Sequence, residues 1–178
     1  MITKAGKAAL LGAYTYASSR KALFEFKTVD NTTKYISNNI GSGIYPYSLT
    51  TTLRLTNSQT GIYVGSGTTQ PTENDNALEN MITSGLTGSI SQIQSFNDET
   101  QKYSLEITIA LTNISSSDIT VNELGLAQYL NASATKGDTT SGVSSYIFLI
   151  DRTVLDEAVT IPASGTKTIK YTLNADMS

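Results

Sequence analysis

The chain has 178 residues and a net charge of −3, and it contains no His, no Cys and no Trp. Without Cys and His, disulfides, thiolate or imidazole metal sites and a Ser-His-Asp triad are excluded. The acidic balance, with a pI near 4.9, also argues against a nucleic-acid-binding surface.

The polar residues of this chain are mostly uncharged. Thr and Ser together fill 48 of the 178 positions, whereas charged residues make up only 15%. Thr favours strands because its branched Cβ suits a pleated surface. The composition therefore predicts an all-β protein, which we expect to be a single domain over residues 1–178. No apolar run approaches the ~20 residues that span a bilayer, so we expect no membrane partner.

The N-terminal segment is predicted to be a short helix. Thr3 is a suitable N-cap, and residues 4–13 are rich in Ala and Leu, which favour helices. This gives a helical arm over about residues 3–14. A secretory signal is the alternative, since Lys4 and Lys7 precede an apolar run, but Tyr14 soon interrupts that run.

Several strands and turns are predicted in the first half of the chain. Residues 23–29 form a strand, residues 30–33 a turn, and residues 36–48 a glycine-containing loop with short strand pieces. Alternation over 47–56 predicts a further strand, with a turn at 57–61. A short apolar strand at 62–64 ends at a glycine pair, and residues 71–75 form a loop.

A second short helix is predicted near residues 76–82. Asn76 can cap its first turn while Glu79, three residues later, reaches back to the cap. Leu78, Met81 and Ile82 would then face the core.

The clearest strand signal lies at residues 102–112. Apolar residues alternate there with polar ones at period two, which a helix would scatter around its axis. One face of this strand should be buried and the other solvated. Residues 89–96 precede it, and residues 97–100 are typical of a hairpin connection.

The alternation slips in residues 119–130. Val121 has the opposite parity to Leu124 and Leu126, so a bulge near Glu123 and Gly125 would return all three apolar side chains to the core. After a loop at 131–144, residues 146–150 form an apolar, central strand. A last pair of strands flanks a turn at 162–165. About eight strands predict an antiparallel β-sandwich of jelly-roll or immunoglobulin-like type.

Few residues are candidates for chemistry. A buried Glu123 would need a partner, so we expect backbone amides to bind it; a calcium site with Asp118 and Asn122 is the alternative. Asp151 and Arg152 are interpreted as an ion pair or an interface contact. Adjacent carboxylates such as those at 156–157 point to opposite strand faces, which disfavours a glycosidase pair. The glycine-rich segment 65–69 lacks the Lys of a phosphate-binding loop.

Tyr35, Tyr45 and Tyr47 gather around a glycine-rich loop. Tyrosine is enriched at protein interfaces because it joins an apolar ring to a polar tip. An ordinary sandwich edge explains the cluster equally well. With Glu123, Gly125 and Arg152, these tyrosines are the candidate structural or interface residues; we expect no catalytic, cofactor-binding or metal-binding residue.

Several phrases of the sequence, in order, resemble a loose family of tailed-bacteriophage virion proteins. The resemblance is carried by five segments: Ile2-Thr3-Lys4-Ala5-Gly6-Lys7, Tyr63-Val64-Gly65-Ser66-Gly67-Thr68-Thr69 followed by Pro71-Thr72, an acidic stretch and Leu78-Glu79, Glu123-Leu124-Gly125-Leu126, Leu149-Ile150-Asp151-Arg152-Thr153-Val154, and Ile161-Pro162-Ala163-Ser164-Gly165-Thr166-Lys167.

The resemblance implies a non-enzymatic structural component of a virion, assembled in the host bacterial cytoplasm. Its partners would be other virion proteins and copies of itself, with no small-molecule substrate. We expect a place in the neck or tail, in a collar, ring or fibre attachment, with several symmetric copies. The alternatives are a capsid decoration or head-fibre anchor, and a receptor- or carbohydrate-binding sandwich that uses the three tyrosines.

Overall fold

The computed structural model describes residues 1–3, 6, 22–37, 52–97, 99, 102–133 and 143–176. Strands hold most of these residues and only Gly6 is helical, so the predicted all-β class is confirmed. Their strands are, in chain order, β1 (Ala22–Lys27), β2 (Thr33–Ser37), β3 (Leu53–Arg54), β4 (Gly61–Gly65), β5 (Leu86–Asn97), β6 (Lys102–Asn113), β7 (Ile119–Ser133), β8 (Val143–Ile161) and β9 (Thr166–Asp176).

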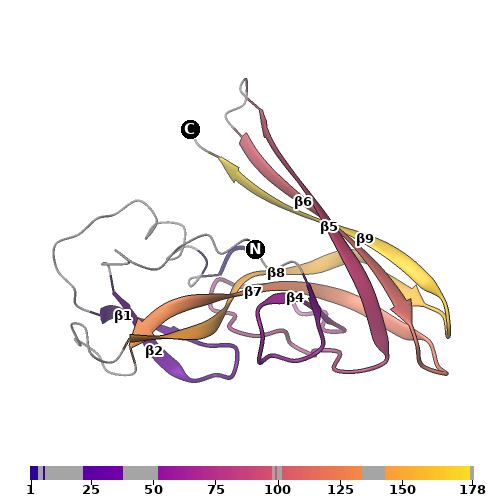
Figure 1. Ribbon diagram of the computed structural model, residues 1–178, viewed down its shortest axis with the longest axis horizontal. Coiled ribbons are helices and arrows are strands. Elements are labelled where there is room, and N and C mark those ends of the chain that lie inside the picture. The colour runs from indigo at the N-terminus through magenta and orange to yellow at the C-terminus, as the bar shows by residue number, and fades with distance from the viewer. Residues whose placement is uncertain are drawn as a thin grey trace.

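The strands form two sheets. In the larger sheet β7 pairs with β8 along one side, and with β4 and the end of β2 along the other. β1 extends this sheet beyond β2, and β3 adds to β4 in parallel. The smaller sheet has the order β5-β6-β9. It rises steeply from the larger one and extends well past it (Figure 1), so we call it the projecting sheet.

The main core lies where the base of the projecting sheet packs on the larger sheet. The apolar residues that alternate along β6 are its largest contribution, and all are buried: Leu105, Ile107, Ile109 and Leu111. They meet Val121, Leu124 and Leu126 of β7, which are also buried. The alternation over residues 102–112 therefore predicted both the strand and its buried face.

β7 shows the irregularity predicted near Glu123, although the extra residues lie on β8, since Val121 pairs with Val159 and Glu123 with Val154. Its register against β8 shifts between Val121 and Glu123, and again between Leu126 and Ala127. The first shift brings Val121, Leu124 and Leu126 to one face despite their opposite parity. Glu123 then points to the other face of the sheet.

That other face is covered by residues 66–82 rather than by a third sheet. A second apolar cluster lies beneath this segment and contains Tyr63, Leu78, Ala127 and Leu149. Both faces of the larger sheet are consequently buried near β7, which explains why a polar residue in this position must find partners inside the protein.

The prediction of a helix near residues 76–82 is wrong. Residues 76–82 run without helical structure, and Met81 forms a bridge with Gly65 at the end of β4. The amides of Glu79 and Asn80 donate to the Glu123 carboxylate instead of joining a helical turn. The expected burial survives, because Leu78 is buried and both Met81 and Ile82 are half-buried.

Three other expectations need correction. The predicted strand at 47–56 is reduced, among the described residues, to Leu53–Arg54. The predicted loop at 131–144 is shorter at both ends, since β7 continues to Ser133 and β8 begins at Val143. β8 is also not central, because β7 is its only partner among the named strands.

Of the predicted N-terminal helix, the structure describes only Gly6, which is helical. The amide of Gly6 donates to Thr3 Oγ1 at 3.1 Å, which is the contact expected of an N-cap. The rest of the predicted helix at 4–13 lies outside the described residues. Among those residues, no helix has the length and apolar character that crossing a bilayer requires.

Candidate functional site

Four charged side chains meet where residues 66–82 cover the larger sheet, namely Asp75, Glu79, Glu123 and Arg152, and we call them the Arg152 cluster. Arg152 on β8 donates from Nε to Glu123 Oε2 at 2.8 Å and from Nη1 to Asp75 Oδ2 at 2.8 Å. Its Nη2 lies 3.6 Å from Glu79 Oε2. Arg152 is 3% exposed and Glu123 is fully buried. An always-charged guanidinium is thus neutralised inside the protein by acids from two different elements.

The Glu123 carboxylate also binds the backbone of the covering segment. It accepts from the amides of Gly67 at 3.1 Å, Asn80 at 2.8 Å and Glu79 at 3.1 Å. The expectation that backbone amides satisfy Glu123 is therefore confirmed, but these amides come from the covering segment and do not have the expected role of fixing a bulge in β7. These amides belong to residues 43 to 56 positions away, so the carboxylate fastens the segment to β7.

Gly65, the last residue of β4, and Gly67 have a steric role at this site. A Cβ on Gly65 would lie 2.5 Å from Glu123 Oε1, and one on Gly67 would lie 2.6 Å from the same atom. Only residues without a side chain leave room for the carboxylate here. The glycines of segment 65–69 are therefore explained by their close approach to Glu123. This agrees with the sequence, which lacks the Lys of a phosphate-binding loop.

Hydrogen bonds favour the charged forms of Asp75, Glu79 and Arg152. Partial burial opposes ionisation of Asp75, but hydrogen bonds from Thr72 and Arg152 outweigh it and hold the pKa of Asp75 below its ordinary value. Hydrogen bonds from Thr69 lower the pKa of Glu79. For Arg152, burial is outweighed by Asp75 and Glu123, which raise its pKa. Such groups stay charged near neutral pH and are poorly suited to proton transfer.

Asp151 faces the opposite side of β8 and has its own partners. Tyr171 on β9 donates its hydroxyl to Asp151, and Thr153 Oγ1 donates to the same carboxylate at 3.2 Å. The α-ammonium of Met1 lies 3.3 Å from it. Burial, followed by the nearby Asp151 charge, raises the pKa of Tyr171 well above its ordinary value. Asp151 and Arg152 therefore bind different elements rather than each other.

Gly125 lies directly opposite Arg152 in the β7–β8 ladder. The first register shift is one residue before Glu123, so Gly125 is not the bulged residue. Its role is close packing: a Cβ there would lie 2.9 Å from Leu149 Cδ1 and from Leu78 Cδ2. The structure thus brings Glu123, Gly125 and Arg152 together at one place.

The other predicted candidates are not part of this site. Tyr35 is half-buried on β2, opposite Glu25 of β1 and Ser133 of β7. Tyr45 and Tyr47 lie outside the described residues.

The oxygen donors considered for calcium do not converge. Asp118 accepts from the Ala163 amide at 3.1 Å, and Asn122 donates to the Ser66 carbonyl at 3.0 Å. The Glu123 carboxylate binds Arg152. Each of the three residues therefore has a different partner, and their closeness in the sequence did not predict a common calcium site.

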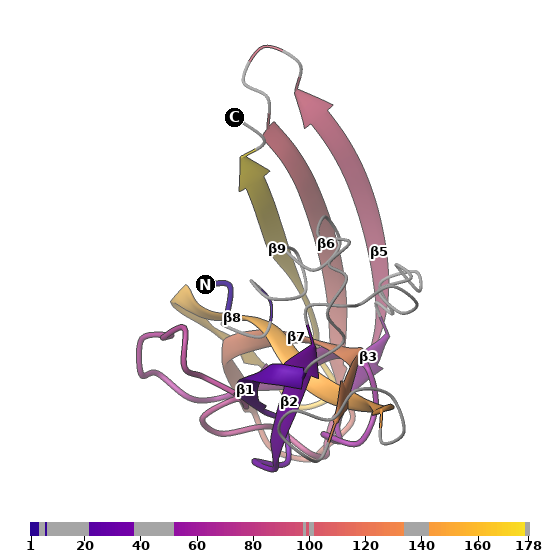
Figure 2. The ribbon, with the colours of Figure 1, turned by 90° about the vertical axis from the view of Figure 1, so that its left-hand side faces the viewer.

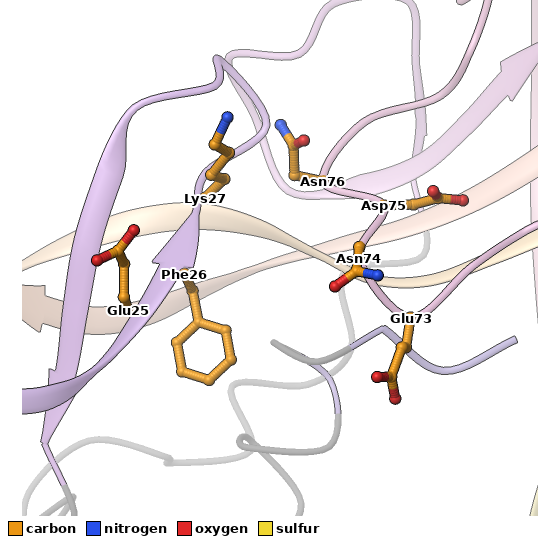
Figure 3. A pocket seen from close by; sticks show the side chains of 7 residues that line it. All are labelled: Glu25, Phe26, Lys27, Glu73, Asn74, Asp75 and Asn76. Atoms are coloured by element: carbon orange, nitrogen blue, oxygen red, sulfur yellow. The ribbon is translucent and has the colours of Figure 1, made fainter.

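A cleft of about 370 Å³ adjoins the Arg152 cluster. Its lining comes from β1 and from residues 73–76. In Figure 3, Asp75 points away from the β1 side chains, consistent with its bond to Arg152. Phe26 supplies the only aromatic ring of the lining, whereas pockets for small molecules are usually mostly apolar.

Sequence analysis missed Asp75 and Glu79 as partners of Arg152. One signal was present: Arg152 is the only basic residue in the apolar stretch 146–155, and a buried cation requires acidic partners. Nothing in the sequence indicated which acids these are. A comparison of the chain with protein-family models, with curated proteins and with solved structures finds no match.

Proposed function

We propose that this chain is a non-enzymatic structural component of a tailed-bacteriophage virion. Its place would be the neck or tail, in a collar, ring or fibre attachment, with several symmetric copies. Other virion proteins and copies of the chain itself are the partners. The proposal starts from the ordered sequence resemblance to virion proteins.

The projecting sheet is the observation that carries the proposal. β5, β6 and β9 extend past the larger sheet as a long, narrow blade (Figure 2). Among the described residues, no strand pairs with the outer side of β5 or of β9. Two open sheet edges are a liability for a lone monomer but useful in an assembly whose neighbours cover them. The Arg152 cluster is consistent with a structural role, since its charged groups bind one another and the backbone.

We also propose that the two sheets form a sandwich of jelly-roll or immunoglobulin-like type. The main core between β6 and β7 supports this assignment. In such a sandwich the base of the blade is the rigid part, and the Arg152 cluster braces the far side of the larger sheet. The blade would then be held at a fixed angle for contacts with neighbours.

Quantitative mass spectrometry of purified particles of the encoding phage tests this function. We expect the chain to co-purify with the particle at about a dozen copies, as a closed ring of the neck or tail would give. Hundreds of copies would place it on the head instead, as a decoration or fibre anchor. Its absence from particles that contain the known capsid and tail proteins would overturn the proposal.

A further inference from the structure

β5 is an unprotected edge strand. It pairs with β6 over twelve residues without a register shift, and no described strand pairs with its other side. Its sequence, residues 86–97, contains no charged residue and no proline. Natural edge strands usually carry such residues or bulges to prevent pairing with another chain. A regular, neutral edge of this length can accept an additional strand.

The opposite edge of the blade is protected. β9 forms the other flank (Figure 2) and carries Lys167 and Lys170. Lys170 pairs with Glu106 of β6 at 3.2 Å. Lysines on an edge strand discourage strand addition. The two flanks of the same sheet therefore differ, and only β5 lacks charges that would oppose an incoming strand.

The sequence of β5 indicates what the incoming strand is. Residues 90–96 read Ile-Ser-Gln-Ile-Gln-Ser-Phe, an apolar and polar pattern that is nearly the same in both directions, with Ile93 at its centre. If a second β5 pairs antiparallel about Ile93, then Ile93 faces Ile93, Ile90 faces Phe96, and the polar residues face polar residues. Self-complementarity of this kind is what a two-fold contact between identical chains requires.

The exposed side chains fit the same arrangement. Ile93 is 67% exposed and Phe96 is 48% exposed. Strand alternation places Ile93 on one face of the blade, and Ile90 and Phe96 on the other. A two-fold axis perpendicular to the sheet leaves equivalent side chains of the two copies on the same face of the joined sheet. Each apolar side chain would therefore gain an apolar cross-strand neighbour.

We propose that two copies of the chain pair through β5, antiparallel and centred on Ile93, to form one six-stranded sheet. This inference rests on the proposed function in one respect, the presence of several copies. It concerns the purified chain, however, so it can fail while the chain is still found in the virion. Equally, the purified chain can pair through β5 while the chain is absent from the virion, and the two experiments tell these outcomes apart.

Charge complementation in the purified chain tests the pairing. The wild type should sediment at about twice 19.0 kDa when concentrated to about 100 µM. Ile93→Lys and Ile93→Glu each place like charges opposite one another, and each should weaken self-association at least tenfold. An equimolar mixture of the two variants should restore the dimer. Thr87→Lys is the control, because it adds the same charge on the same face but faces Glu99, an opposite charge beyond the end of β5. It should not weaken self-association.

Cysteine cross-linking then fixes the geometry, since the chain has no Cys of its own. Oxidised Ile93→Cys should form a disulfide-linked dimer by itself, because residues on the axis are directly opposite. Thr168→Cys on β9 should not. A cross-link that forms only in a mixture of these two variants would mean β5–β9 pairing and would overturn the proposal. So would a wild-type monomer at all concentrations, or an Ile93→Lys dimer of unchanged affinity.

Discussion

Glu123 and Arg152 form a buried ion pair although they are not directly opposite in the β7–β8 ladder. Glu123 is opposite Val154, and Arg152 is opposite Gly125. The two charged side chains meet diagonally, at 2.8 Å, on the face that residues 66–82 cover. Because the pair also holds the amides of that segment, it joins β7, β8 and the covering segment in one unit.

Removing the cation should be costly. Arg152→Met leaves the buried Glu123 carboxylate without its charge partner, and we expect the free energy of unfolding to fall by about 3–5 kcal/mol. Urea denaturation measures this change. Lys170→Ala, which breaks the exposed pair with Glu106, is the control and should cost about 1 kcal/mol or less. Equal losses for the two variants would contradict the role of the Arg152 cluster.

Removing the anion should release the covering segment. Glu123→Gln replaces one acceptor oxygen with an NH₂ group, which cannot accept the amide hydrogens that the carboxylate binds. Hydrogen exchange at the amides of Gly67, Glu79 and Asn80 should accelerate at least about tenfold. Amides in the core of β6 should change less. Uniform acceleration across the chain would indicate global destabilisation rather than local release.

The glycine at position 67 should resist substitution. A Cβ there would lie 2.5 Å from Glu79 Cβ and 2.6 Å from Glu123 Oε1. The buried Glu123 cannot move away, so Gly67→Ala should cost about 1–3 kcal/mol in thermal or urea unfolding. Ser66→Ala, at the neighbouring position, should cost less than about 1 kcal/mol. Tolerance of Gly67→Ala would show that the carboxylate is not fixed against the segment.

Acid should weaken the attachment of residues 66–82. The pKa of Asp75 lies below its ordinary value of 3.8 because its hydrogen bonds outweigh its partial burial. The unfolded chain then binds more protons than the folded one, so this contribution is present above the ordinary pKa and is lost as pH falls through the folded pKa. Urea denaturation at pH 7 should give the wild type a higher free energy of unfolding than Asp75→Asn. The difference between the two free energies should shrink below about pH 4. A difference that stays constant down to pH 2 would contradict this assignment.

The strands of the core could be predicted from sequence because their burial is local and periodic. The alternation along β6 indicated its buried face, and the phase slip at Val121 and Leu124 indicated a bulge. Each signal depends on neighbouring residues alone. The turn after β1 is similar, since Thr28 and Asp30 bind Thr32 within a few residues.

The parts that could not be predicted depend on distant contacts. Asn76 and Glu79 have the spacing of a helix cap, but the amides of Glu79 and Asn80 bind a carboxylate more than 40 residues away. Asn76 itself donates to the Thr28 carbonyl at 2.9 Å. The partners of Arg152 are likewise 29 and 77 positions away. Local propensity carries no information about such partners.

Cryo-electron microscopy of the intact phage tests the central claim most directly. The account predicts density for this chain in a symmetric set of copies on the neck or tail, with the β5 flank of each blade covered by protein. Density for the known virion proteins with none for this chain, at a resolution that traces strands, would contradict it.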